Sequence, residues 1–354
     1  MSPMTAEIAL VDDARLSLRR RPYEAAREEW ARLVAASRDA TLSHGERWLA
    51  ALERTYRLRF EILALVDERT DETLAAGIFA PSRSLFGRRF VSLPFSDACP
   101  PLAASPGYRD LWARELSRSD VYPRAEIRGY GAAPPWQVAT TFVEWKLRID
   151  RNAQELRRAM DGNFRRQLRR GEESGFDVRC GNSADDVRAF YELMLLTRQR
   201  FGLPAQPLSF FQNLVEIFGR DSEVWLVAKN GRDLAAMFLL RERDTIHYRW
   251  SARVQPLPLG ASHVMIWRVL EHHSGRAYDL NLGRNDYRNS GISRFKTELG
   301  ATSTPLPYSF FPRSPQAVSA ERLEGFRALL ARVWQRTPLP VARRLGPRLY
   351  KFLS

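Results

Sequence analysis

The order of helices and strands expected from the sequence repeats at about residue 150. Before that point, apolar spacing predicts a strand over 6–11, helices from Pro22 and over 46–56, strands over 60–67, 73–80 and 90–94, a helix over 108–118, and strands over 125–128 and 137–144. After it, the pattern predicts helices over 152–173 with a break near Gly162, a strand over 176–179, a helix after the N-cap Ser183, a helix over 207–218, strands over 223–229, 233–241 and 245–251, a helix over 261–273 and a strand over 278–282. Helices followed by a mostly antiparallel meander indicate an α/β (α+β) fold and not a dinucleotide-binding βαβ fold. The shared order indicates an internal structural duplication.

The length of the chain agrees with a duplication. A chain of 354 residues is too long for one ordinary core. We expect an N-terminal domain over 1–150, a second domain of the same kind over 151–314, and a basic amphipathic helical tail over 315–354.

The charge balance predicts an anionic partner. The formal net charge is +14, which favours RNA, a phosphate-bearing substrate or an anionic membrane surface. The alternative is that arginine-rich usage only reflects solvated faces. Two cysteines and five histidines show no metal-ligand spacing, so no metal site is expected. There is no apolar leader and no run of about 18 apolar residues, so we expect a cytoplasmic protein without a signal peptide or spanning helix.

The tail alternates apolar and basic residues. Its first helix has apolar positions Leu323, Phe326, Leu329, Leu330, Val333 and Trp334; its last segment places Val341, Leu345, Leu349, Phe352 and Leu353 among Arg343, Arg344, Arg348 and Lys351. Such a pattern fits either a peripheral contact with an anionic membrane surface or docking of the apolar stripe on the protein itself.

A lysine closes the predicted strand–turn–helix over 279–301. Only four of the 55 basic residues are lysines, and Lys296 is one of them. A lysine is a compact point charge that can meet a phosphate or polarise a carbonyl. The alternative is an exposed lysine on the flank of a helix.

Three sequence segments, in order, carry a family resemblance. The run LNLGR…SGISRFKTELGA over 280–301 resembles the closing motif of the Fem-like and BioF2-like acyltransferases of the GNAT superfamily. RFVSLPFSD over 89–97 is similar to the strand-and-loop signature of their first half, and NFRRQLRRGEESG over 163–175 to the basic helix that opens their second half. The resemblance spans about residues 5–312 and implies tandem GNAT domains.

The resemblance implies roles for the closing motif. In this family main-chain groups on a splayed strand hold the acyl donor, and a helix N-terminus receives its phosphates. Phe295 would stack on a donor base, and Lys296 would meet phosphate or the oxyanion of the tetrahedral intermediate. Gly283 would shape the turn and Arg284 would bind phosphate. Asp286 is a candidate proton acceptor, with an Asx turn as the alternative.

The phosphate loop expected of a GNAT domain is altered. Residues 253–262 read RVQPLPLGAS, with one glycine and two prolines in place of a glycine-rich loop. Gly260, Ala261 and Ser262 remain candidate main-chain donors at the start of the helix. This departure puts coenzyme A binding in question.

Two further segments are candidates for the acceptor side. Arg165, Arg166 and Arg169, with Arg170, stack along a helix at i, i+4 spacing, and the resemblance places this helix beside the acceptor's phosphates. The alternative is a solvated helix balanced by Glu172 and Glu173. In the same family the loop that holds Ser92, Ser96 and Asp97 borders the acceptor cleft.

These features together predict an N-acyltransferase. The donor would be acyl-CoA or an aminoacyl-tRNA, without a permanently bound cofactor. The acceptor would be an amine on a cell-envelope or exopolysaccharide precursor, linked to a nucleotide or a lipid. The alternative is a non-catalytic module that binds RNA or a membrane surface on a degenerate GNAT fold.

Overall fold

The computed structural model describes residues 16–84, 87–119, 121–275, 278–311 and 330–350. The chain forms two compact units that interleave along the sequence. Unit 1 comprises residues 1–46, 58–139 and 307–314, and unit 2 comprises 47–57, 140–306 and 315–354. The α/β fold class is confirmed. The three-part domain division stays a prediction. The strand expected over 6–11 lies outside the described residues.

Unit 1 is a mixed sheet with two helices. Its strands run in the order β1-β2-β3-β4-β6-β13, and the short β5 pairs with β3. The strands are β1 (Leu16–Pro22), β2 (Glu61–Asp67), β3 (Glu72–Ser84), β4 (Gly87–Val91), β5 (Leu102–Ala103), β6 (Ala125–Arg128) and β13 (Thr302–Phe311). The helices are α1 (Tyr23–Ala36) and α3 (Pro106–Arg118). Trp112, Phe79 and Tyr122 fill the core between α3 and the sheet.

Three described strands of unit 1 were not predicted: β1, β13 and the two-residue β5. β1 carries Arg19 and Arg20, which pair with Asp71 and Glu61 far away in the sequence, so local propensity does not identify it. β13 contains Pro305 and Pro307, which argue against a strand. The carbonyl of Pro307 nevertheless accepts a hydrogen bond from the Gly129 amide at 2.9 Å.

Unit 2 has a larger sheet with helices on both faces. The strand order is β7-β12-β11-β10-β9-β8. These strands are β7 (Gln137–Arg148), β8 (Asp177–Gly181), β9 (Ser222–Lys229), β10 (Arg232–Glu242), β11 (Thr245–Arg253) and β12 (Asp279–Asp286). Its helices are α2 (Glu46–Tyr56), α4 (Ala153–Ala159), α5 (Gly162–Glu173), α6 (Ala184–Arg200), α7 (Leu208–Phe218), α8 (Ala261–His273), α9 (Ser290–Leu299) and α11 (Leu339–Tyr350). The predicted α2 and α8 agree with the observed bounds.

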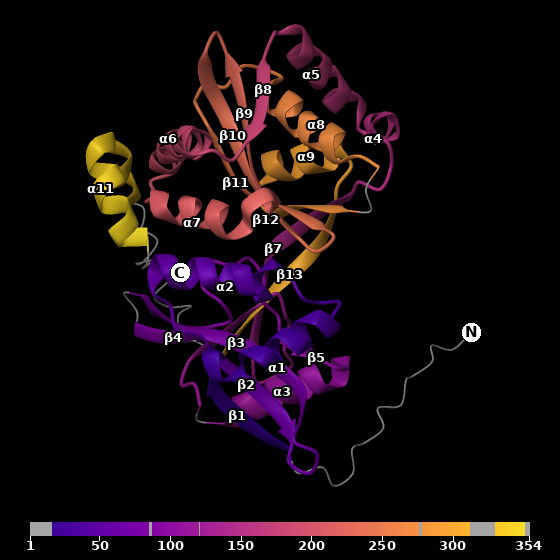
Figure 1. Cartoon of the computed structure of the whole chain (residues 1–354), viewed down its shortest axis with the longest axis vertical. Coiled ribbons are helices and arrows are strands. Elements are labelled where there is room, and N and C mark those ends of the chain that lie inside the picture. The colour runs from indigo at the N-terminus through magenta and orange to yellow at the C-terminus, as the bar shows by residue number, and fades with distance from the viewer. Residues whose placement is uncertain (1–15, 85–86, 120, 276–277, 312–329, 351–354) are drawn as a thin grey trace. The chain divides into compact units, whose positions relative to one another are not determined.

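Alternation along β10 divides the core of unit 2 between the two faces of the sheet. Met237 and Leu239 belong to the cluster that includes α5 and α8, whereas the Phe238 ring packs on Phe190 and Phe211 of α6 and α7. Figure 1 shows these two pairs of helices on opposite sides of the strands. Successive side chains of a strand point to opposite faces, so one strand supports both layers.

The tail is helical where the structure describes it. Residues 330–336 and α11 are helices, while the predicted positions Leu323, Phe326, Leu329, Phe352 and Leu353 lie outside the described residues. Across the described ranges of the chain, every helix is too short or too polar to cross a bilayer.

Candidate functional site

Strands β11 and β12 diverge in the middle of the unit-2 sheet. They pair in parallel at Thr245–Asp279, Ile246–Leu280 and His247–Asn281. Beyond those pairs β11 continues against β10 as far as Arg253, and β12 continues against β7 as far as Asp286. In the described residues, 248–253 and 282–286 are therefore not paired with each other. A divergence of this kind turns main-chain groups of two central strands toward a position that a ligand can occupy.

Both strands are distorted at the divergence. The register of β12 against β7 shifts between Asn281 and Arg284, around Gly283, which has φ +70°. The register of β11 against β10 shifts so that Arg249 has no Cα partner on β10. Bulges of this kind re-aim strands near functional sites.

Lys296 lies beneath the turn at the end of β12. Its side chain extends from α9, and the residue is only 6% exposed. Nζ donates to the carbonyl of Gly283 at 3.1 Å and to Oδ1 of Asn285 at 3.0 Å. The ammonium lies 5.9 Å from the centre of the Trp145 ring. The alternative of an exposed lysine on a helix flank is therefore wrong. Lys296 links α9 to the turn of β12.

The remaining residues of the closing motif support this turn. Oδ1 of Asp286 accepts a hydrogen bond from the Arg288 amide at 2.8 Å, so the Asx-turn alternative is observed. Asn285 Nδ2 donates to Ser293 Oγ at 3.1 Å, which ties the turn to α9. The guanidinium of Arg284 lies 4.2 Å from the centre of the Phe142 ring.

Gly260, at the start of α8, is in close contact with α5. It has φ +83°, and a Cβ built there would lie 2.5 Å from Cα of Gly171. Ala261 is buried, and its amide donates to the Pro258 carbonyl at 3.3 Å. Ser262 is half-buried. The single glycine of this loop thus permits close packing of two helices, and its role in donor binding stays a prediction.

Phe295 packs inside an aromatic group. Its ring centre lies 5.5 Å from that of Phe164 and 5.3 Å from that of His263. Burial lowers the pKa of His263, and its Nδ1 has no hydrogen-bond partner in the described structure. The spacing of the sequence gave no signal for His263, because its partners come from α5 and α9. Phe295 is half-buried rather than an open stacking platform.

The arginines of α5 have different environments. Arg165 Nη1 donates to the carbonyls of Arg158 and Met160 at 2.9 and 2.5 Å, which closes the junction with α4. Arg166 Nη2 donates to Asn163 Oδ1 at 2.5 Å. Arg169 is exposed and makes no ion pair within the described chain. Arg169 and Arg170, which are both exposed, are therefore the members of the predicted cluster best placed to meet an anion from solvent.

The candidate acceptor loop lies in unit 1 and is strained. Leu93 and Phe95 have φ +68° and +64°, values that bulky residues rarely adopt and that concentrate at functional sites. Ser92 Oγ accepts from the amide of Arg128 at 2.8 Å. The Ser96 carbonyl accepts from Arg128 Nη1 at 3.0 Å, and the Asp97 carbonyl accepts from the Tyr308 hydroxyl at 2.6 Å.

A buried ion pair holds this loop. Arg128 Nε donates to Glu126 Oε1 at 2.7 Å, and Arg89 lies 3.0 Å from the other oxygen of Glu126. Burial lowers the pKa of Arg128, but Glu126 and Tyr308 raise it more, so the pKa is raised overall. Local spacing gives no signal for this pair, because both residues lie on the short strand β6 and their other partners come from β4 and the loop after it.

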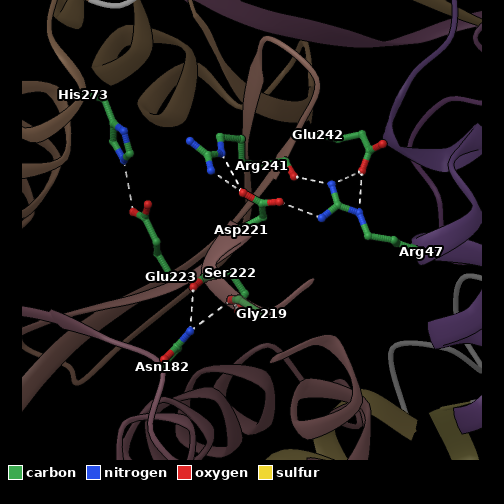
Figure 2. A network of polar contacts seen from close by, with 9 residues as sticks. All are labelled: Arg47, Asn182, Gly219, Asp221, Ser222, Glu223, Arg241, Glu242 and His273. Carbon is green, nitrogen blue, oxygen red and sulfur yellow. Dashed lines mark hydrogen bonds and ion pairs between the residues drawn. The ribbon is translucent and has the colours of Figure 1, made fainter. Parts of the chain in front are cut away.

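Unit 2 contains a separate polar network at the end of β10. Arg47 contacts Asp221 and Glu242 at 2.7 Å each, and Asp221 also pairs with Arg241 (Figure 2). These pairs hold α2 on the rest of unit 2. The network includes no residue of the divergence.

One group of side chains in the described structure could hold a metal ion. The ligand atoms of Glu223, His272 and His273 lie within 4.8 Å of one another. The Glu223 carboxylate already accepts from Trp225 Nε1 at 2.8 Å and lies 3.1 Å from His273 Nε2 (Figure 2). A metal ion would have to replace the contact with His273. The expected absence of a metal site stays a prediction.

The structure brings together the candidate donor residues of the closing motif, whereas Gly260 at the start of α8 packs against α5. Lys296 and Gly283 are in contact, Arg284 and Asp286 lie further along the same strand, β12, and Phe295 precedes Lys296 on α9. Ser92, Ser96 and Asp97 form a second group in unit 1. We interpret the opened central strand pair beside a buried ammonium as a candidate ligand site of the class that uses main-chain groups.

Comparisons with known proteins agree with this class. Residues 156–296 match the acetyltransferase (GNAT) domain. The search of curated proteins found no match. The chain is similar to the crystal structure of FemX, with 13% identity, coverage of 80% of this chain and 95% of that chain, and a TM-score of 0.55. It is also similar to L-PGS from Bacillus licheniformis, with 13% identity, coverage of 88% and 97%, and a TM-score of 0.52.

The divergence lies within the matched residues. The chain has a fold similar to that of FemX, and the match to the acetyltransferase (GNAT) domain lies within unit 2. The matched residues include 280–296 of the closing motif, and the predicted relation to the GNAT superfamily is confirmed.

Proposed function

We propose that this chain is an N-acyltransferase that forms an amide from an activated acyl donor and an amine. The observation that carries the proposal is Lys296, which is buried directly beneath the turn of β12, where β11 and β12 diverge. The donor is acyl-CoA or an aminoacyl-tRNA, and no permanently bound cofactor takes part.

The reaction joins a nitrogen to a carbonyl carbon. The amine attacks the donor's acyl carbon, and the tetrahedral intermediate collapses with expulsion of the coenzyme A thiolate or of the ribose oxygen of tRNA. The nitrogen loses one proton. Main-chain donors of β11 or β12 would stabilise the oxyanion. Asp286 is the candidate proton acceptor, because only one of its oxygens is used by the Asx turn in the described structure.

Lys296 supports the chemistry from below the turn. Its ammonium already has two protein acceptors, so its role is to fix the turn and to supply positive charge there. Arg284, further along β12, is the candidate phosphate ligand. Phe295 would contact the donor only through the part of its ring that Phe164 and His263 do not cover.

The proposed acceptor is an amine on a cell-envelope or polysaccharide precursor that carries phosphate. The net charge of +14 and the exposed Arg169 of α5 support an anionic acceptor. Ser92, Ser96 and Asp97 are candidate acceptor residues because they surround a strained loop.

One observation favours a second function. Gly260 packs against Gly171, and the loop before α8 lacks the glycines of a phosphate loop. A chain of this kind could bind RNA or a membrane surface without catalysis. Such a module would not depend on Lys296 for its binding.

Calorimetry with two donors tests the proposal. Acetyl-CoA and alanyl-tRNA would each be titrated at about 50 and 300 mM NaCl, with uncharged tRNA as the control. Micromolar binding of acetyl-CoA that changes little with salt supports a coenzyme A donor. Tight binding of alanyl-tRNA that weakens steeply with salt, and exceeds that of uncharged tRNA, supports an aminoacyl donor. Failure of both donors to bind contradicts the proposal.

A further inference from the structure

The last described segment docks on unit 2 through one face of α11. Ala342 and Gly346 are buried, and a Cβ built on Gly346 would lie 3.4 Å from the backbone nitrogen of Ala205. Arg343 pairs with Glu192 of α6 at 2.6 Å. The Tyr350 ring stacks on Tyr56 with centres 6.3 Å apart. Figure 1 shows α11 beside α6. The docked face thus consists of small residues and a terminal tyrosine.

The large apolar residues of α11 are on the exposed side. Val341, Leu345 and Leu349 are 41%, 42% and 45% exposed. Their i, i+4, i+8 spacing aligns them in one stripe along the helix. Arg344 and Arg348 are exposed as well, each next to a leucine of the stripe. α11 thus docks on the protein through Ala342 and Gly346, while the described residues of the predicted stripe stay partly exposed.

The segment carries strong positive charge, and of its described arginines only Arg343 has an acidic partner. Residues 325–354 contain seven basic and no acidic residues. Arg332, Arg336, Arg344 and Arg348 make no ion pair with any described residue. The exposed stripe therefore lies beside several arginines that have no acidic partner among the described residues.

The neighbouring surface has the same character. Residues 330–336 pack on the end of α6, where Gln335 Nε2 donates to the Arg200 carbonyl at 3.0 Å. Val333 is 59% exposed on this segment, and Phe201 is 58% exposed just beyond α6. Apolar side chains and unpaired arginines thus occur together on both described parts of the tail.

We propose that the exposed stripe of α11 binds the surface of an anionic lipid bilayer. The helix would lie in the plane of the interface with Val341, Leu345 and Leu349 among the acyl chains. Arg344 and Arg348 would reach the headgroup phosphates, since long basic side chains extend toward water while their stems stay apolar. A second copy of this chain fits less well, because the stripe would bring two uncompensated arginine clusters together. The inference does not depend on acyl transfer.

Vesicle flotation with the full chain tests the inference. The probes are vesicles of phosphatidylcholine alone and of phosphatidylcholine with about one third phosphatidylglycerol, at low and high salt. We expect binding to the anionic vesicles only, and weaker binding at high salt. Arg344→Gln with Arg348→Gln should lower the partition coefficient about thirtyfold, because each basic residue near an anionic surface strengthens binding about fivefold. Leu345→Ser with Leu349→Ser should lower it at least tenfold.

The controls separate the stripe from general effects. Leu259→Ser changes an apolar side chain that is 70% exposed elsewhere on unit 2 and should leave vesicle binding unchanged. Thermal unfolding should be the same for all variants, because the altered side chains are exposed. Equal binding to both vesicles, or stripe variants that bind as the parent does, would overturn the inference. The inference would also be overturned if the parent chain did not bind vesicles and the stripe variants instead lost self-association or lost binding to an acidic protein.

Discussion

Replacement of Lys296 by methionine removes one buried charge and changes the volume of the side chain only slightly. In the parent the ammonium donates to the Gly283 carbonyl and to Asn285 Oδ1 at 3.1 and 3.0 Å. The variant leaves both acceptors without this donor. It also removes a charge from a residue that is only 6% exposed, so solvent screening of the lost contacts is small.

The expected cost in stability follows from these contacts. A hydrogen bond to a charged group contributes about 1.5–3 kcal/mol, so the two bonds together contribute about 3–6 kcal/mol. The methionine offsets part of this loss, because a buried ammonium no longer has to be desolvated and the thioether can pack on Trp145. We expect the free energy of unfolding to fall by about 2 kcal/mol, which the fold should tolerate.

The assay compares stability and transfer in the same preparations. Urea unfolding gives the free energy, and transfer of a labelled acyl group to an amine gives the rate. We expect Lys296→Met to lower the rate about 100- to 1,000-fold, as loss of an electrostatic contact near an oxyanion does elsewhere. Lys146→Met makes the same change at a residue whose side chain is 51% exposed, and it should alter stability by less than about 0.5 kcal/mol. Full activity of the folded Lys296 variant would refute the reasoning.

Three further changes test the structure around the site. Gly171→Ala should cost about 1–3 kcal/mol of stability in urea unfolding, because its Cβ would meet the main chain of α8; Gly162→Ala, with open space at the Cβ, should change it little, and equal effects would contradict this account. Arg128→Met should lower the free energy of unfolding by about 3–5 kcal/mol, because it leaves Glu126 buried without its main partner. The double variant with Glu126→Gln should recover part of this loss; effects of the two changes that simply add would contradict the account. Burial lowers the pKa of His263 in the fold, so below about pH 6.5 the unfolded chain binds a proton that the folded chain does not. Unfolding free energies at pH 7 and 5 should therefore show a loss on acidification that His263→Gln reduces; an unchanged loss would exclude His263 as its source.

The sequence predicted the elements whose signals are local. The periodicity of α2 and α8 is strong, and Asn230-Gly231 between β9 and β10 has the two positive φ values of a hairpin turn. β1 was missed because its arginines find partners only through the fold. β13 was missed because its prolines weaken the strand signal.

The candidate site could be predicted only in part. Lys296 and Gly283 come from one continuous motif, so the sequence placed them near each other. Burial of Lys296, the divergence of β11 and β12, and the packing of Gly260 on Gly171 each depend on elements that are distant in the sequence. The pair formed by Glu126 and Arg128 was missed for the same reason.

Hydrogen exchange upon donor binding tests the central claim most directly. Backbone amides of residues 248–253 and 282–286 would be followed with and without a non-transferable acyl-CoA analogue and with charged tRNA. Main-chain binding at the divergence predicts that one donor slows exchange in both segments, whereas exchange in the α3 helix of unit 1 stays unchanged. Donor binding that leaves both segments exchanging as before would contradict the account.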